Sequence, residues 1–152
     1  MSKLNYKHIL YTTELSENWK EIFSHALGIT EQYKAKLTFL YVVNTELIDL
    51  LTFDVGLERF PSIDKKFTEA KEYTTNINKQ ITKKITRAFG KETIKDINIL
   101  VERGRPVKII LNVAEEKKCD LIVIGFKGTA TLKNTTIGST VNKVLQRSKR
   151  PV

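Results

Sequence analysis

Apolar residues recur along the chain with two different spacings, which predict alternating strands and helices. Runs rich in β-branched and aromatic residues predict strands at residues 7–11, 36–43 and 120–125. Between residues 97 and 104, apolar and polar residues alternate, which predicts a strand with one covered face. Apolar positions spaced three and four residues apart predict a helix after each strand.

Residues that favour helix ends mark the limits of these helices. Ser16 is the expected N-cap of the first helix, because its hydroxyl can accept from amides that lack a partner. The second helix is expected to end at Gly90, a residue favoured just after a helix. Pro106 suits the first turn of the third helix, where its missing N–H costs nothing. The last helix is expected at about residues 138–147.

The order β-α-β-α-β-α-β-α predicts the fold class. We expect a single α/β domain over residues 1–152, with a Rossmann-like, doubly wound, mainly parallel sheet. Right-handed crossovers place helices on both faces of such a sheet. The unbroken apolar run within residues 120–125 is typical of a strand covered on both faces.

Two segments fit this pattern less well. Residues 44–63 are long for a connection between a strand and a helix. Their apolar residues, from 47 to 60, predict either an extra short helix folded onto the domain or a lid or partner surface. Residues 149–152 resemble the entry into a further strand.

Composition and charge narrow the class of protein. The 152 residues carry a net charge of +9 and are 41% apolar, as in ordinary globular domains. One cysteine and two histidines exclude a disulfide framework and a Cys/His zinc site. With no long apolar run and no signal peptide, we expect a soluble cytoplasmic protein without a membrane partner. The basic residues are scattered along the chain without interleaved aromatic residues, which favours a solvated surface over specific nucleic-acid binding.

The candidate chemistry lies where the predicted strands end, because ligands of such sheets bind at the carboxyl ends of the strands. Gly125 and Gly128 allow close approach of the backbone after the last strand. The start of the last helix, at residues 138–140, offers free amides to an anion, and Lys127 could neutralise it. The loop is therefore predicted to wrap a di- or triphosphate; the alternative is that its glycines only cap a strand and start a helix.

The spacing Gly125-x2-Gly128-x9-Gly138-Ser139 resembles the nucleotide loop of the universal stress protein family, in its ATP-binding branch. Residues 9–16, 40–43, 102–106 and 120–125 resemble other segments of that family, so the resemblance covers nearly the whole chain.

The resemblance implies an adenine-nucleotide alpha-hydrolase-like fold that binds ATP, with any Mg²⁺ held by the phosphates. Val42 would hold adenine through its backbone. Ile124, at the end of the last strand, is also implied as a cofactor-binding residue. The residues implied beneath adenine and ribose are Thr12, Thr13 and Glu14. Those implied around the phosphates are Gly125, Lys127, Gly128, Gly138, Ser139 and Thr140. The family also implies a homodimer that acts in stress response and regulation.

Three functions remain open from the sequence. The chain could be a nucleotide-binding regulatory protein, a slow ATP hydrolase, or an interaction module that has lost nucleotide affinity and works through residues 47–60. No residue is an evident base for activating water, so no catalytic residue is assigned and hydrolysis ranks lower. His8, His25 and Cys119 have no partners at catalytic or metal-binding spacing and are interpreted as structural or surface residues.

Overall fold

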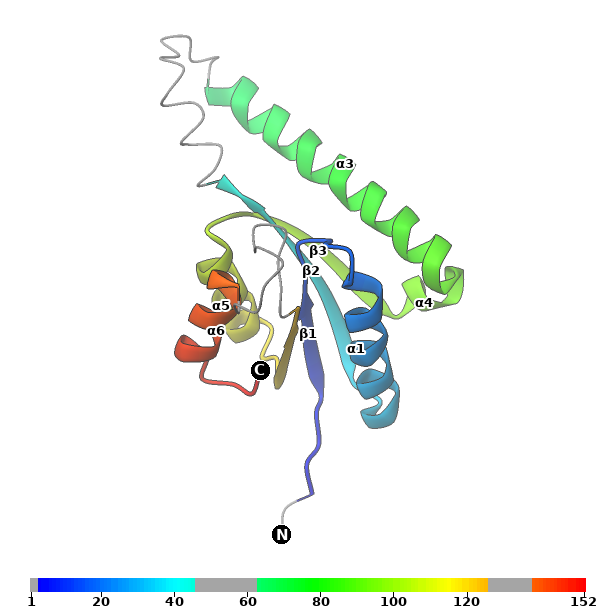
Figure 1. Cartoon of the computed structure of the whole chain (residues 1–152). Helices are drawn as coiled ribbons and strands as arrows, with labels where there is room; N and C mark the ends of the chain where they lie inside the picture. The colour runs from blue at the N-terminus through cyan, green and yellow to red at the C-terminus, as the bar shows by residue number, and fades with distance from the viewer. Residues whose placement is uncertain (1–2, 46–62, 126–137) are drawn as a thin grey trace.

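Four parallel strands form a single sheet in the computed structural model, which describes residues 3–45, 63–125 and 138–152 (Figure 1). The strand order is β3-β2-β1-β4. The strands are β1 (His8–Thr12), β2 (Lys36–Asn44), β3 (Ile97–Gly104) and β4 (Leu121–Ile124). The helices are α1 (Trp19–Tyr33), α3 (Ile63–Phe89), α4 (Lys91–Lys95), α5 (Pro106–Glu116) and α6 (Ser139–Arg147). The predicted doubly wound, parallel α/β fold is confirmed.

The strand order changes direction at β1. From β1 the chain adds β2 and then β3 on one side, and it crosses back to place β4 on the other side. Thr12, the last residue of β1, is in register with Leu40 of β2 and Ile124 of β4. The carboxyl ends of β1 and β4 therefore form the switch point, where ligands of this fold class bind.

Each face of the sheet has its own hydrophobic cluster, because successive side chains of a strand point to opposite faces. Helices α1, α3 and α4 lie on one face, and α5 and α6 lie on the other (Figure 1). The first cluster, here the aromatic face, consists of Ile9, Tyr11, Trp19, Phe23, Ala26, Leu37, Phe39, Ile81 and Ile85. The second, here the aliphatic face, consists of Leu10, Leu40, Ile110, Val113, Ala114, Cys119, Ile122 and Val144.

The predicted start of the first helix is wrong. Helix α1 begins at Trp19 with Asn18 as its N-cap, and Asn18 makes no side-chain cap bond. The hydroxyl of Ser16 donates to Asn18 Oδ1 at 3.0 Å, and the Ser16 carbonyl accepts from the Trp19 amide at 3.0 Å. Leu15, just before Ser16, has a left-handed backbone with φ +59°, which is not helical. Its amide donates to Thr13 Oγ1, and its side chain packs against the aromatic face.

Two glycines set the path of the chain around β3. Gly90 follows α3, as predicted, and its φ of +94° turns the chain into α4, a short helix that sequence periodicity did not indicate. Gly104, which ends β3, has φ +151°. A Cβ atom at this position would lie 2.9 Å from Ile109 Cδ1 and Cγ1, so a side chain would collide with α5. The predicted first-turn position of Pro106 is confirmed.

Two predicted segments have different outcomes. The apolar residues 47–60 lie outside the described residues. Residues 149–152, expected to enter a further strand, form no strand in the described sheet, but the Ile122 amide donates to the Pro151 carbonyl at 2.9 Å. The chain thus returns to the edge of β4.

A hydrogen-bond network around His8 joins the amino ends of β1, β2 and β4. Nδ1 of His8 donates to the Lys117 carbonyl at 3.0 Å, which leaves Nε2 of the neutral ring to accept from Thr38 Oγ1 at 2.8 Å. The Asp120 carboxylate accepts from the amides of Lys7 and His8 at 2.6 and 2.9 Å. Burial lowers the pKa of His8 below 6.5, although the bond to the Lys117 carbonyl and the Asp120 charge oppose this shift.

We expect His8 to make the stability of the fold depend on pH. Because its pKa is lower in the folded state, the unfolded chain binds more protons below about pH 6.5, and the free energy of unfolding falls as pH decreases. His8→Gln removes this titration and keeps a donor and an acceptor. Denaturant unfolding should therefore show that the free energy of unfolding falls more between pH 7.5 and pH 5.5 for the wild type than for the variant. Equal losses would contradict the assignment.

Candidate functional site

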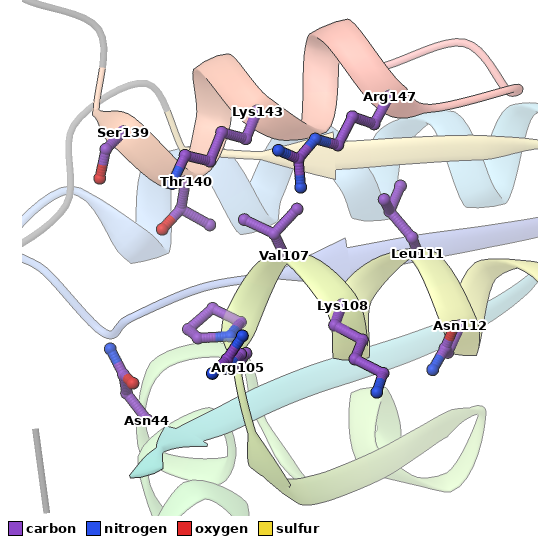
Figure 2. Close-up of a pocket in the computed structure, with 11 residues that line it drawn as sticks. Asn44, Arg105, Val107, Lys108, Leu111, Asn112, Ser139, Thr140, Lys143 and Arg147 are labelled. Carbon is purple, nitrogen blue, oxygen red and sulfur yellow. The ribbon is translucent and has the colours of Figure 1, made fainter. Parts of the chain in front are cut away.

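A cavity of about 590 Å³, the α5–α6 cavity, lies between these two helices on the aliphatic face (Figure 2). Asn44, the last residue of β2, lines the end of the cavity near the carboxyl edge of the sheet. Helix α5 contributes Val107 and Leu111, whose side chains also pack against the aliphatic cluster. The cavity therefore has an apolar floor that is continuous with the core.

All charged residues in the described lining of this cavity are basic. Arg105 and Lys108 come from the start of α5, and Lys143 and Arg147 come from α6. These four side chains are exposed, and no Asp or Glu is among the described lining residues. They are exposed, as expected for a solvated surface, and the structure gathers these four at one cavity. A lining of this composition favours an anionic ligand.

Helix geometry adds to this positive field. Helices α5 and α6 follow the parallel strands β3 and β4, so both begin near the carboxyl edge of the sheet. Neither has an acidic residue in its first turn. The start of a helix carries the positive end of its dipole, which favours an anion. Ser139 and Thr140, the first two residues of α6, line the cavity at this position.

The structure brings only some of the predicted site residues to this cavity. Ser139 and Thr140 line it, and Gly138 is the buried N-cap of α6. Val42 and Ile124 lie on the same face, packed against the aliphatic cluster. The remaining predicted residues in the described part are the buried Thr12 at the end of β1, Thr13 and Glu14 after it, and Gly125 after β4; none lines the cavity.

Two of these residues have contacts of their own. The Thr13 hydroxyl accepts from the Leu15 amide at 2.9 Å, so it shapes the turn after β1. The charge of Glu14 helps to raise the pKa of Tyr41, after burial and Tyr73. Lys127 and Gly128, predicted to contact the phosphates, lie outside the described residues.

Sequence reasoning missed the basic lining, although the sequence carries a signal for it. Ser139, Lys143 and Arg147 are spaced four residues apart, and this spacing places them on one side of a helix. Arg105 and Lys108 are three apart at the start of the facing helix. The helical spacing of these basic residues indicates a cationic side on each of the two helices.

Other candidate groups have structural surroundings. Cys119 is buried, and burial raises the pKa of its thiol to about 11, which makes it unreactive at neutral pH. His25 is exposed on α1. Among the residues that the structure describes, no three His, Cys, Asp or Glu side chains are grouped to hold a metal ion. In the same part of the chain, no helix has the length and apolar character needed to cross a membrane.

Comparison with known proteins identifies the family. A model of the universal stress protein family matches residues 5–152. The chain belongs to this family. Universal stress protein MJ0531 of Methanocaldococcus jannaschii is 31% identical over 147 residues, which cover 97% of this chain and 80% of that protein. Universal stress protein MJ0577 of the same organism is 27% identical over 153 residues, with 97% and 93% coverage.

Solved structures of the family have the same fold. Universal stress protein UspA from Lactobacillus plantarum superimposes with a TM-score of 0.74 at 22% identity, over 99% of this chain and 97% of that one. A universal stress protein crystallised in complex with cAMP gives a TM-score of 0.61 at 21% identity, over 98% and 95% of the two chains. The family fold inferred from the glycine spacing is therefore confirmed.

Proposed function

We propose that this member of the universal stress protein family binds ATP at the carboxyl edge of its sheet and acts as a nucleotide-dependent regulator in stress response. The observation that carries the proposal is the start of α6, where Ser139 and Thr140 line a cavity whose described charged residues are all basic. This arrangement suits phosphates, because amides and cations both stabilise negative charge.

The position of the cavity supports an adenine nucleotide. Val42, expected to hold adenine through its backbone, lies on the same face as the cavity. Thr12, Thr13 and Glu14, expected beneath adenine and ribose, lie at and after the carboxyl end of β1, within the switch point. The family member crystallised with cAMP supports recognition of an adenine nucleotide by this fold.

The chemistry of the cavity favours binding over catalysis. Of the described residues that line it, none is an Asp, Glu or His that could act as a general base. We therefore propose that ATP acts as a ligand and that any Mg²⁺ is held by its phosphates. The homodimer and the cytoplasmic location expected from the family resemblance and the sequence remain predictions.

Thermal unfolding with Mg-ATP tests this proposal. At a concentration about 100 times Kd, a ligand that binds only the folded state adds about 2.7 kcal/mol to the free energy of unfolding. For a chain of this length we expect Tm to rise by roughly 5–10 °C, saturably, relative to MgCl₂ alone. No rise in Tm at millimolar ATP, with nucleotide-stripped protein, would contradict the proposal.

A further inference from the structure

The basic residues of the α5–α6 cavity extend further along α6 than its N-terminal anion site requires. A helix dipole acts within the first turn, where Ser139 and Thr140 lie. Lys143 and Arg147 follow on the same side of the helix, about 6 and 12 Å further along its axis from Ser139. The positive charge is therefore spread over the length of the cavity and is not confined to one end.

Basic residues from the α5 and α6 segments both line the cavity. Arg105, the N-cap of α5, and Lys108 line the cavity together with Lys143 and Arg147 of α6. The side chains of Val107 and Leu111 point toward α6, whereas that of Lys108 points away from it (Figure 2). Helix α6 contains no acidic residue, so none of its own side chains can neutralise Lys143 or Arg147. Such a channel fits a ligand that carries negative charges at regular intervals along an extended chain.

The lining also indicates which polyanion fits. No aromatic side chain is among the described lining residues, so the cavity lacks the stacking platform on which single-stranded nucleic acids bind. Several cations along one cavity suit a chain of phosphates, because every phosphate carries negatively charged oxygens.

We propose that the α5–α6 cavity binds a linear polyphosphate chain longer than a triphosphate. The bound polyphosphate begins at Ser139 and Thr140 and continues past Lys143 to Arg147. This proposal deepens the proposed function, because the same cavity end receives the phosphates of ATP. A phosphate chain of this kind has two chemical sources: inorganic polyphosphate, or the bridge of a dinucleoside polyphosphate such as diadenosine tetraphosphate.

The test compares two doubly substituted full-length proteins that lose the same charge. Lys143→Gln/Arg147→Gln alters the cavity, whereas Lys83→Gln/Lys84→Gln alters two exposed positions on α3, on the aromatic face. Affinities for inorganic polyphosphate, diadenosine tetraphosphate and Mg-ATP are measured by calorimetry at several salt concentrations. Because Arg147 lies in the last turn of α6, where a cation stabilises the helix, Lys143→Gln alone is the second cavity variant.

We expect the cavity double variant to weaken polyphosphate binding by about tenfold or more, and to weaken ATP binding less. Two lost phosphate contacts should also reduce the slope of log K against log salt by roughly 1.5. The α3 variant should change neither value appreciably. Diadenosine tetraphosphate binding with the same dependence would assign the chain to a dinucleotide; weakening of inorganic polyphosphate alone would assign it to the free polymer.

Three results would overturn the proposal: no polyphosphate binding by the wild type, equal weakening in the cavity and α3 variants, or a loss of ATP affinity as large as that of polyphosphate. The proposed function fails independently. Polyphosphate binding that depends on the cavity, together with no ATP binding, would leave this inference standing and reject ATP as the ligand. ATP binding without polyphosphate binding would reject this inference and leave the proposed function standing.

Discussion

Ser139→Asp should weaken ATP binding by at least about tenfold while leaving the apo protein as stable as the wild type or more so. Ser139 is the first residue of α6, and it lines the α5–α6 cavity. A carboxylate here would face the phosphates: two like charges 4 Å apart repel by about 1 kcal/mol in bulk water and about 4 kcal/mol near a protein surface. The same carboxylate improves the helix by about 0.3–1 kcal/mol, because it lies at the positive end of the dipole.

The opposite signs of these two effects make the experiment informative. Binding is measured by calorimetry, and stability is measured by thermal unfolding without ligand. Ser139→Asn is the matched control, since it is similar in size to Asp but neutral, and it should keep most of the affinity. Unchanged ATP affinity in Ser139→Asp would show that the phosphates do not bind at the start of α6.

Phe23→Ala should lower the free energy of unfolding by about 3–5 kcal/mol, as expected when a large aromatic side chain is removed from a core. This is the largest effect on stability among the substitutions proposed for this protein. Phe23 is fully buried on the aromatic face. Its ring centroid lies 5.0 Å from that of Tyr11, 5.1 Å from Phe89 and 5.2 Å from Phe39. At 2–4 °C per kcal/mol for a chain of this length, Tm should fall by roughly 6–20 °C.

Tyr73→Ala is the matched control for this loss, because Tyr73 is an aromatic residue of α3 that is 51% exposed. Its removal should change the free energy of unfolding by about 0.5 kcal/mol or less. Below its Tm, Phe23→Ala should bind ATP like the wild type, since Phe23 lies on the face opposite the cavity. Similar losses of stability in both variants would contradict the assignment of Phe23 to a closely packed core.

The elements that the sequence predicted well are those whose signal is local. The apolar run of β4 and the periodicity of α5 reflect burial of side chains on the same element, so a short window of sequence contains the information. The start of α1 could not be predicted this way. Leu15 combines a left-handed conformation with a hydrogen bond to Thr13 and with packing of its side chain on the aromatic face, and this packing is a tertiary contact that a short window of sequence does not contain.

The candidate site was predictable only at one end. Ser139 and Thr140 were found because glycine spacing and a helix start lie close together in the sequence. Arg105 and Arg147 belong to different helices, and only the crossover that packs α5 beside α6 brings them to one cavity. No local pattern contains that information. The helical spacing of the basic residues indicates a charged side on each helix but not that the two sides face each other.

The separation of aromatic and aliphatic side chains between the two faces also determines what the intrinsic tryptophan fluorescence of the protein reports. Trp19, the only tryptophan of the chain, is buried on the aromatic face, within 6.2–6.3 Å of the ring centroids of Phe23, Phe39 and Phe89. The described lining of the α5–α6 cavity contains no aromatic residue. The tryptophan emission spectrum therefore reports whether the core is intact, and the sheet separates this fluorophore from a ligand bound in the cavity.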